Sequence, residues 1–104
     1  RQLAALVAYI GAEVPAAEPF ILAGDFNDWR QEACTVLADE LGAQEAFRRR
    51  HGRLAATFPV RRPILPLDRI YVRGLEVREA RAHAGSPWVG LSDHAPLSAI
   101  LVPN

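Results

Sequence analysis

The 104-residue sequence predicts a small domain of the α/β (α+β) class. Apolar residues recur with the period of an amphipathic helix in residues 1–12 and again in about 31–41. Apolar or alternating runs of strand length lie at residues 20–23, 67–72, 75–83 and 96–102. The expected order along the chain is therefore helix, strand, helix, loop and then three strands.

Each predicted helix has one apolar face. In the first helix, which Pro15 ends, this face consists of Leu3, Leu6, Val7 and Ile10. In the second helix, which Gly42 ends, it consists of Cys34, Leu37, Ala38 and Leu41. Cys34 is therefore predicted to be a small core residue rather than a reactive thiol. The residues that follow, 43–53, fit either a basic loop or a helix end.

The strand-like runs differ in pattern. Phe20–Ala23 is short and wholly apolar, which is typical of a buried strand. Residues 67–72 alternate, so Asp68 is expected on a face with two β-branched residues, where a half-buried carboxylate would sit. The opposite face of that strand carries Leu67, Arg69 and Tyr71. The last two runs predict a half-exposed strand and a closing strand, and the prolines within 59–66 predict an irregular loop.

The composition is that of an ordinary globular domain and excludes several classes of protein. Half of the residues are apolar and 23% are charged, and no apolar run approaches the ~20 residues that span a membrane. The single Cys excludes an internal disulfide framework. No signal peptide is visible, so we expect a cytoplasmic protein. The chain begins at Arg1 and contains no Met, which predicts a processed product or a piece of a longer protein.

Charge is balanced overall but is segregated along the chain. Twelve basic residues, all of them Arg, balance twelve acidic ones. Residues 1–47 contain two Arg and eight acidic residues, whereas residues 48–104 contain ten Arg and four acidic residues. Such segregation fits a basic face for an anionic substrate. It fits equally well two halves that pack on each other.

A polar segment follows the first predicted strand, at Gly24-Asp25-Phe26-Asn27-Asp28. Residues two apart in an extended chain point the same way, so Asp25 and Asn27 project side by side from the strand end. A carboxylate and an amide in this arrangement could position water, ligate a hard cation or hold a phosphate. The alternative is an Asx-rich turn, because Asp, Asn and Gly are common turn residues.

Two further polar positions complete the set of candidate site residues. Asp68 interrupts an apolar strand, and the pair Asp93–His94 precedes the last strand. A polar group at such a position is unfavourable unless it is paired or used. A histidine needs a carboxylate or carbonyl on its far ring nitrogen to fix its tautomer, and Asp68 is a candidate partner for His94. The alternatives are an ion pair between Asp68 and a neighbouring Arg, and a simple strand-initiating loop at His94.

Together these segments resemble the endonuclease/exonuclease/phosphatase superfamily. The resemblance rests on three stretches that occur in the family's order: Ile21–Asp28, Leu67–Tyr71 and Leu91–Pro96. A fourth similar segment is Thr57-Phe58-Pro59. It implies that residues 1–104 form the carboxyl-terminal half of the domain of a bacterial member. That half of a four-layer α/β/β/α sandwich would contain one mostly antiparallel or mixed sheet with helices on one face.

The resemblance also implies a chemistry. Family members hydrolyse phosphate esters with Mg²⁺ or Mn²⁺, through attack of water at phosphorus. On that pattern Asp25 would orient or deprotonate the water, Asn27 would hold the water or a phosphoryl oxygen, and His94 would stabilise the transition state. Asp68 would accept from the other ring nitrogen of His94. Asp93 would hold the metal, with Asp25 and Asn27 as further candidate ligands.

The substrate implied is a nucleic acid, a phospholipid or another phosphodiester. Candidate substrate contacts are Trp29, Arg69 and Trp88, with loop packing of the tryptophans and solvation of the arginine as the alternatives. Nothing before Phe20 resembles the amino-terminal half of the family domain, which carries the principal metal-binding Glu. We therefore expect the chain alone to be inactive and to self-associate through an exposed apolar sheet face. A non-catalytic structural or binding module and a hydrolase of another fold are the alternative functions.

Overall fold

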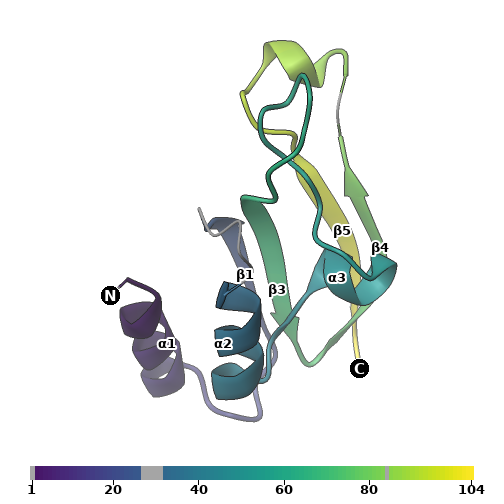
Figure 1. Ribbon diagram of the computed structural model, residues 1–104. Helices are drawn as coiled ribbons and strands as arrows, with labels where there is room; N and C mark the ends of the chain where they lie inside the picture. The colour runs from purple at the N-terminus through teal and green to yellow at the C-terminus, as the bar shows by residue number, and fades with distance from the viewer. Residues whose placement is uncertain (1, 27–31, 84) are drawn as a thin grey trace.

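The computed structural model describes residues 2–26, 32–83 and 85–104. Its elements, labelled in Figure 1, are in chain order α1 (Gln2–Glu13), β1 (Phe20–Asp25), α2 (Glu32–Leu41), β2 (Gln44–Glu45), α3 (Ala46–His51), β3 (Asp68–Arg73), β4 (Leu75–Ala82), the 3₁₀ turn η1 (Trp88–Gly90) and β5 (Leu97–Pro103). The α/β class and the predicted order of the longer elements are confirmed. Within the described ranges, no helix is long and apolar enough to cross a membrane.

The strands form two antiparallel sheets rather than the single sheet expected. One sheet has the order β1-β3-β2, and the other consists of β4 and β5. Between β3 and β4 the chain turns at Gly74, which has a φ of 76°. A Cβ at this position would lie 3.0 Å from the Cβ of Pro19, so the turn requires glycine for both conformation and space. After this turn β4 runs along β5 and so belongs to the second sheet.

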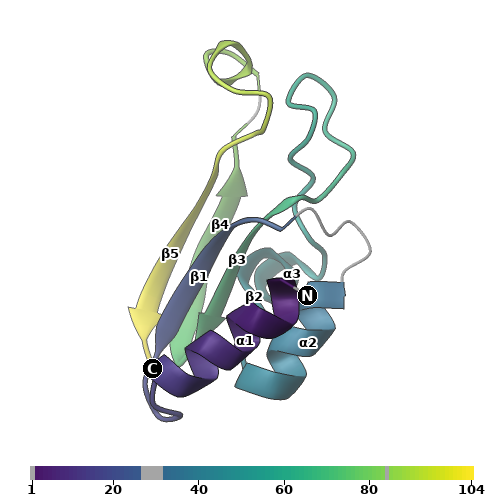
Figure 2. The ribbon, with the colours of Figure 1, turned by 90° about the vertical axis from the view of Figure 1, so that its left-hand side faces the viewer.

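The helices α1 and α2 cover one face of the β1-β3-β2 sheet (Figures 1 and 2). The predicted apolar faces of both helices are largely confirmed, although Ala38 is exposed; one core cluster contains Leu3, Leu6, Val7, Ile10, Cys34, Leu37 and Leu41. Tyr71 of β3 is fully buried in the same cluster. Its hydroxyl lies 3.4 Å from the Sγ atom of Cys34, so Cys34 is a core residue, as predicted.

The other face of β3 contributes to a second core cluster. There Val72 packs with Phe47 of α3 and with Val77 and Ala80 of β4. In Figure 1 the layers follow one another from left to right, with α1 and α2 first, then β1 and β3, and then α3 with β4 and β5. β3 is thus the strand that the two clusters share.

β1 is exposed on one face, which contradicts the prediction of a strand buried on both. Phe20 and Leu22 pack against the helix layer, whereas Ile21 is 56% exposed and Ala23 is exposed as well. β1 is an edge strand of its sheet, and the helices cover alternate side chains only. The apolar run therefore reflects a half-covered strand.

Residues 43–53, for which the sequence left a basic loop and a helix end as alternatives, fold around Glu45. The carboxylate of Glu45 accepts from the Arg48 backbone N–H at 2.8 Å, which caps α3, and from the Ile70 N–H of β3 at 3.1 Å. Burial raises the pKa of Glu45, and the residue is only 3% exposed. The helix ends at Gly52, whose left-handed conformation (φ 83°) closes it.

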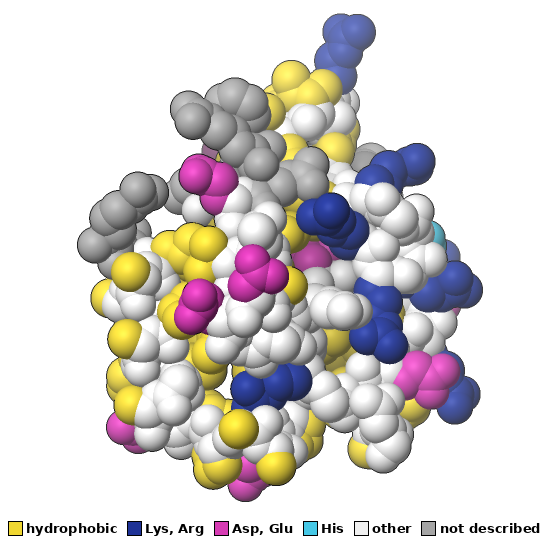
Figure 3. Space-filling model, turned by 60° about the horizontal axis from the view of Figure 1, so that its bottom comes forward, with side chains coloured by type: hydrophobic (Ala, Val, Ile, Leu, Met, Phe, Trp, Pro, Cys, Tyr) yellow, Lys and Arg dark blue, Asp and Glu magenta, His cyan; other side chains and the backbone are white. Residues whose placement is uncertain are grey.

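The arginines of α3 and β4 form an exposed basic face. Figure 3 shows basic side chains gathered on the side of the molecule that carries these two elements. Arg48, Arg49 and Arg50 lie in the last turn of α3 and are exposed, and the side chain of Arg78 in β4 is 61% exposed. These arginines therefore lie on the surface, and the two halves of the chain also pack on each other through the pairing of β1 with β3.

Candidate catalytic site

Strand pairing brings two carboxylates to the same end of the three-stranded sheet. β1 ends at Asp25 and β3 begins at Asp68, and the antiparallel register places these two residues opposite each other. Residues that pair across antiparallel strands point to one face of the sheet, here the face away from α1 and α2. Like charges in this position repel each other, so the arrangement favours a cation or a hydrogen-bond donor between them.

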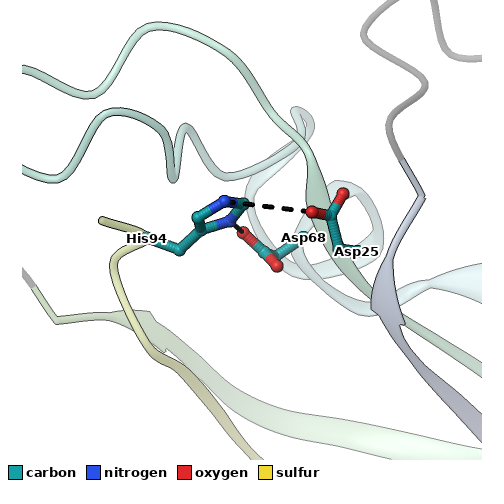
Figure 4. Close-up of side chains that lie close together, drawn as sticks. All are labelled: Asp25, Asp68 and His94. Carbon is teal, nitrogen blue, oxygen red and sulfur yellow. Dashed lines mark hydrogen bonds and ion pairs between the residues drawn. The ribbon is translucent and has the colours of Figure 1, made fainter. Parts of the chain in front are cut away.

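The ring of His94 points its two nitrogen atoms toward the two carboxylates (Figure 4). Its Nδ1 atom is 2.5 Å from Oδ2 of Asp68, so that Nδ1–H donates to this carboxylate. Its Nε2 atom is 3.8 Å from Oδ2 of Asp25. The predicted contact between Asp68 and a ring nitrogen of His94 is confirmed. One carboxylate therefore fixes the ring, and the second ring nitrogen faces the other carboxylate.

The site is half open to solvent and negatively charged. The exposed fractions of the side chains are 24% for Asp68, 29% for His94 and 38% for Asp25. The hydrogen bond to Asp68 raises the pKa of His94, and the negative charges of Asp68, Asp25 and Asp93 add to this, while desolvation opposes it. His94 therefore holds a proton more strongly than an ordinary histidine, and the protonated ring can donate from Nε2 as well.

The same three side chains form a cluster that could hold a metal ion. One ligand atom from each of Asp25, Asp68 and His94 lies within 4.8 Å of the others. Carboxylate oxygens are the ligands that Mg²⁺ and Mn²⁺ prefer in proteins. The contact between Asp68 and His94 already occupies Nδ1 of the ring and Oδ2 of the carboxylate.

Asp93 adjoins this cluster. Among the described residues, the group with metal-ligand spacing consists of Asp25, Asp68 and His94 and does not include Asp93, which is exposed. Its negative charge nevertheless helps to raise the pKa of His94. Its predicted role as the metal ligand stays a prediction.

Three other predicted site residues are Asn27, Trp29 and Trp88. Asn27 and Trp29 lie outside the residues that the structure describes. Trp88 lies in η1, and its ring centroid is 5.4 Å from that of His83. This contact fits the loop-packing alternative, and substrate binding by Trp88 stays a prediction.

Arg69 is buried in the protein, which corrects the prediction that it contacts substrate. The residue is 1% exposed. Its Nε donates to the carbonyl of Pro66 at 3.0 Å, and its Nη1 donates to the hydroxyl of Tyr71 at 3.2 Å. Successive residues of a strand point to opposite faces, so Arg69 faces the helix layer while Asp68 faces the site.

Phe58 is a site neighbour to which the sequence assigned no role. Its ring centroid lies 5.0 Å from that of His94, with an interplanar angle of 51°. An aromatic ring at this distance restricts the movement of the imidazole and covers part of it from water. The sequence signal that could have identified Phe58 was the segment Thr57-Phe58-Pro59. Its resemblance to a family segment indicated where it lies in the domain but gave it no function.

The chain is similar to curated proteins whose names state no activity. It is 51% identical over 98 residues to the uncharacterized protein YbhP of Escherichia coli strain K12, a match that covers 94% of this chain and 38% of YbhP. It is 38% identical over 82 residues to a UPF0294 protein of Vibrio cholerae (El Tor Inaba N16961), which covers 76% of this chain and 26% of that protein. The chain therefore spans less than half the length of these relatives. No solved structure matches the chain at a comparable level of significance.

A family model extends the comparison to most of the chain. The model of the endonuclease/exonuclease/phosphatase family matches residues 1–94. The matched stretch contains Asp25, Asp68 and His94, the three residues that the fold brings within contact of one another. The chain thus belongs to the endonuclease/exonuclease/phosphatase family.

Proposed function

We propose that this chain is the carboxyl-terminal half of a metal-dependent phosphoesterase, a phosphodiesterase or a nuclease. The observation that carries the proposal is the position of His94, which Asp68 holds through Nδ1 and whose Nε2 lies beside Asp25. Membership of the family supports the reaction class. The substrate is a phosphate ester in a nucleic acid, a phospholipid or another phosphodiester.

Each of the three side chains has a role in the proposed reaction. Asp25, at the exposed end of β1, orients the attacking water and accepts its proton. His94 donates from Nε2 to a non-bridging oxygen of the phosphate, where negative charge increases during the attack. Asp68 fixes the ring orientation and favours the protonated imidazole, in keeping with its effect on the pKa of His94.

The donor set suits a hard divalent cation such as Mg²⁺ or Mn²⁺, because it offers carboxylate oxygens. Asp93 would hold the cation, with Asp25 and Asn27 as further ligands. When bound, such a cation neutralises phosphate charge and lowers the pKa of water. These cations take about six ligands, so water, substrate or other parts of the protein must supply the rest.

We further propose that the active protein extends beyond these residues. The chain corresponds to 38% of the length of YbhP, and its resemblance is to the second half of the family domain. The complete domain would form the four-layer sandwich and supply the remaining metal ligands. The chain alone would then be inactive. A cytoplasmic location stays a prediction.

The exposed apolar residues of both sheets support a proposal of self-association for the isolated chain. Ile21 in β1 and Ile100 in β5 are 56% and 55% exposed. Exposed apolar side chains on sheets favour association when nothing covers them. Sedimentation of the isolated chain should therefore show dimers or larger species, which Ile21→Ser should weaken. A monomer at all concentrations would contradict this proposal.

A hydrolysis assay on the complete protein tests the proposed function. The protein is given Mg²⁺ and either DNA, a phospholipid or a generic phosphodiester. The site variants Asp25→Asn and His94→Ala are compared with Asp39→Asn and His51→Ala, which change the same residue types outside the site. We expect kcat/KM to fall about 10²–10³-fold in the site variants and to change less than about twofold in the controls.

Two outcomes would contradict the proposal. Activity that survives both site substitutions would defeat the assigned mechanism. A wild-type protein that hydrolyses none of the three substrates would favour the non-catalytic binding module instead.

Salt dependence separates the candidate substrates. A nuclease contacts several phosphates with cationic side chains, so its affinity for DNA falls steeply as the salt concentration rises. The exposed arginines of α3 and β4 are candidates for such contacts. A lipid phosphodiesterase need not show this dependence, and a flat salt profile would therefore favour a phospholipid.

A further inference from the structure

One loop segment holds the backbone on both sides of His94. The N–H of Ala95 donates to the carbonyl of Thr57 at 2.8 Å, and the N–H of Val60 donates to the carbonyl of Asp93 at 2.6 Å. The residues directly before and after His94 are thus bound to the segment Thr57–Val60. Because both flanking peptides are fixed, the position of this segment determines the position of the histidine backbone.

The same segment reaches the other member of the pair through a side chain. The hydroxyl oxygen of Thr57 accepts from the backbone N–H of Asp68 at 3.2 Å. The hydroxyl also lies 3.5 Å from the carbonyl of Leu65, to which the Thr57 N–H donates at 3.0 Å. Thr57 is fully buried, so these contacts are shielded from water.

We infer that Thr57 is a positioning residue that sets the separation of Asp68 and His94. Its side-chain oxygen binds the backbone of Asp68, and its carbonyl binds the residue after His94. One residue therefore links the two chain segments that carry the pair, which are 26 positions apart in sequence. The inference rests on the proposed function for its effect on catalysis, but the geometry of the pair can be measured without activity.

The expected consequence follows from the hydrogen bond between the side chains of Asp68 and His94. One hydrogen bond joins these side chains, and a hydrogen bond weakens steeply as its distance and angle depart from the optimum. Removing the hydroxyl of Thr57 frees the amide of Asp68 to move relative to His94. Losses of about tenfold in activity are typical when a residue that orients a site group is changed.

A pair of substitutions in the complete protein tests this inference. Thr57→Val keeps the shape of the side chain and removes the hydroxyl, whereas Thr57→Ser keeps the hydroxyl and removes the methyl group. We expect Thr57→Val to lower kcat about tenfold with KM nearly unchanged, and Thr57→Ser to restore most of the activity. Thr35→Val, at an exposed threonine of α2, is the matched control and should leave kcat unchanged.

A spectroscopic measurement reports on the pair directly. In ¹⁵N-labelled, metal-free protein, the Nδ1 proton of His94 should give a far-downfield resonance, assigned by its loss in His94→Gln. We expect Thr57→Val to shift or broaden this resonance and Thr57→Ser to preserve it. If Thr57→Val does not fold, Thr57→Ala and Thr57→Ser form the comparison, because they also differ by one hydroxyl group.

The outcomes separate this inference from the proposed function. A Thr57→Val protein that melts at a lower temperature but keeps its kcat and its resonance would show a merely structural role and overturn the inference. Equal losses in Thr57→Ser would also overturn it, because they would assign the effect to the methyl group. A wild type without phosphoesterase activity whose resonance still responds to Thr57→Val would reject the function and retain the positioning role.

Discussion

The two faces of β3 place charged side chains in opposite surroundings. On the face toward α1 and α2, Arg69 is 1% exposed, and its guanidinium donates to the Pro66 carbonyl and the Tyr71 hydroxyl. On the other face, the side chain of Asp68 is 24% exposed and meets the ring of His94. These two residues are adjacent in sequence. Their partners differ. Arg69 binds oxygen atoms of the interior, whereas Asp68 binds the ionisable ring of His94 at the end of the sheet.

The comparison teaches that the partner of a charged side chain determines its role. The role is either to stabilise the fold or to take part in the candidate site. Arg73 follows the same rule on the helix side, where its guanidinium donates to the carbonyls of Pro15, Glu18 and Leu41. These bonds tie the connection between α1 and β1 to the end of α2. A charge whose partners belong to the backbone stabilises the fold, whereas the ring of His94 can gain or lose a proton near neutral pH.

The largest expected effect is on catalysis and concerns Asp68. Asp68→Asn should lower kcat of the complete protein about 10²-fold, because an amide cannot favour the protonated form of His94 as a carboxylate does. Its melting temperature should change little. Steady-state kinetics and thermal unfolding measure the two quantities. An Asp68→Asn protein with normal kcat and a much lower melting temperature would place Asp68 with the structural residues.

The next effect is on stability and concerns Tyr71. Tyr71→Phe removes the oxygen that accepts from Arg69 and contacts Cys34, within the buried layer between β3 and the helices. The free energy of unfolding should fall by about 1–3 kcal/mol, and kcat should stay at the wild-type value. Urea denaturation measures the stability. A large loss of kcat at unchanged stability would break the division between the two faces.

A third prediction concerns a buried carboxylate that serves the fold. Glu45→Gln replaces one of the two oxygens that accept from the N–H groups of Arg48 and Ile70 by an amide group that cannot accept. The free energy of unfolding should fall by about 1–2 kcal/mol, with little change in kcat. Glu40→Gln, an exposed position of α2, is the control and should unfold like the wild type. Equal stability of all three proteins would refute the capping role.

The smallest effect is a pH dependence that arises from His94. The bond to Asp68 raises the pKa of His94 above its ordinary value of 6.5. Its contribution to stability is therefore fully present below this value and is lost as the pH rises through the higher pKa of the folded state. In metal-free protein, stability measured by urea denaturation should fall as the pH rises from the ordinary pKa of 6.5 through the higher pKa of the folded state, and His94→Gln should reduce the fall. If stability depends on pH in the same way in His94→Gln and in the wild type, the fall does not arise from His94.

The site was predictable from the sequence because its residues interrupt apolar strands. Asp25 follows one apolar run and Asp68 breaks another, and a strand ends or begins at each of them. Antiparallel pairing then places these two carboxylates opposite each other. The contact of His94 with Asp68 was expected from the need of an imidazole for a partner on its second nitrogen.

Other features depend on contacts between distant parts of the chain and could not be predicted in this way. The alternation of β3 placed Arg69 opposite Asp68, but it did not show that α1 and α2 cover the face of Arg69. The strand β2 has two residues, which is too short for any periodic pattern. The separation into two sheets depends on the direction of β4 after the turn at Gly74 and on its pairing with β5. No local sequence pattern predicts either of them.

The register of β1 against β3 also limits how the protein can change in length. Side chains alternate between faces, so a slip of one residue would turn Asp25 toward α1 and α2 and bring Gly24 to face Asp68. An insertion of two residues would restore the face but move the carboxylate by about 7 Å along the strand. Strand length is thus under the same chemical constraint as residue identity, and insertions in β1 should be as damaging to function as the loss of Asp25 itself.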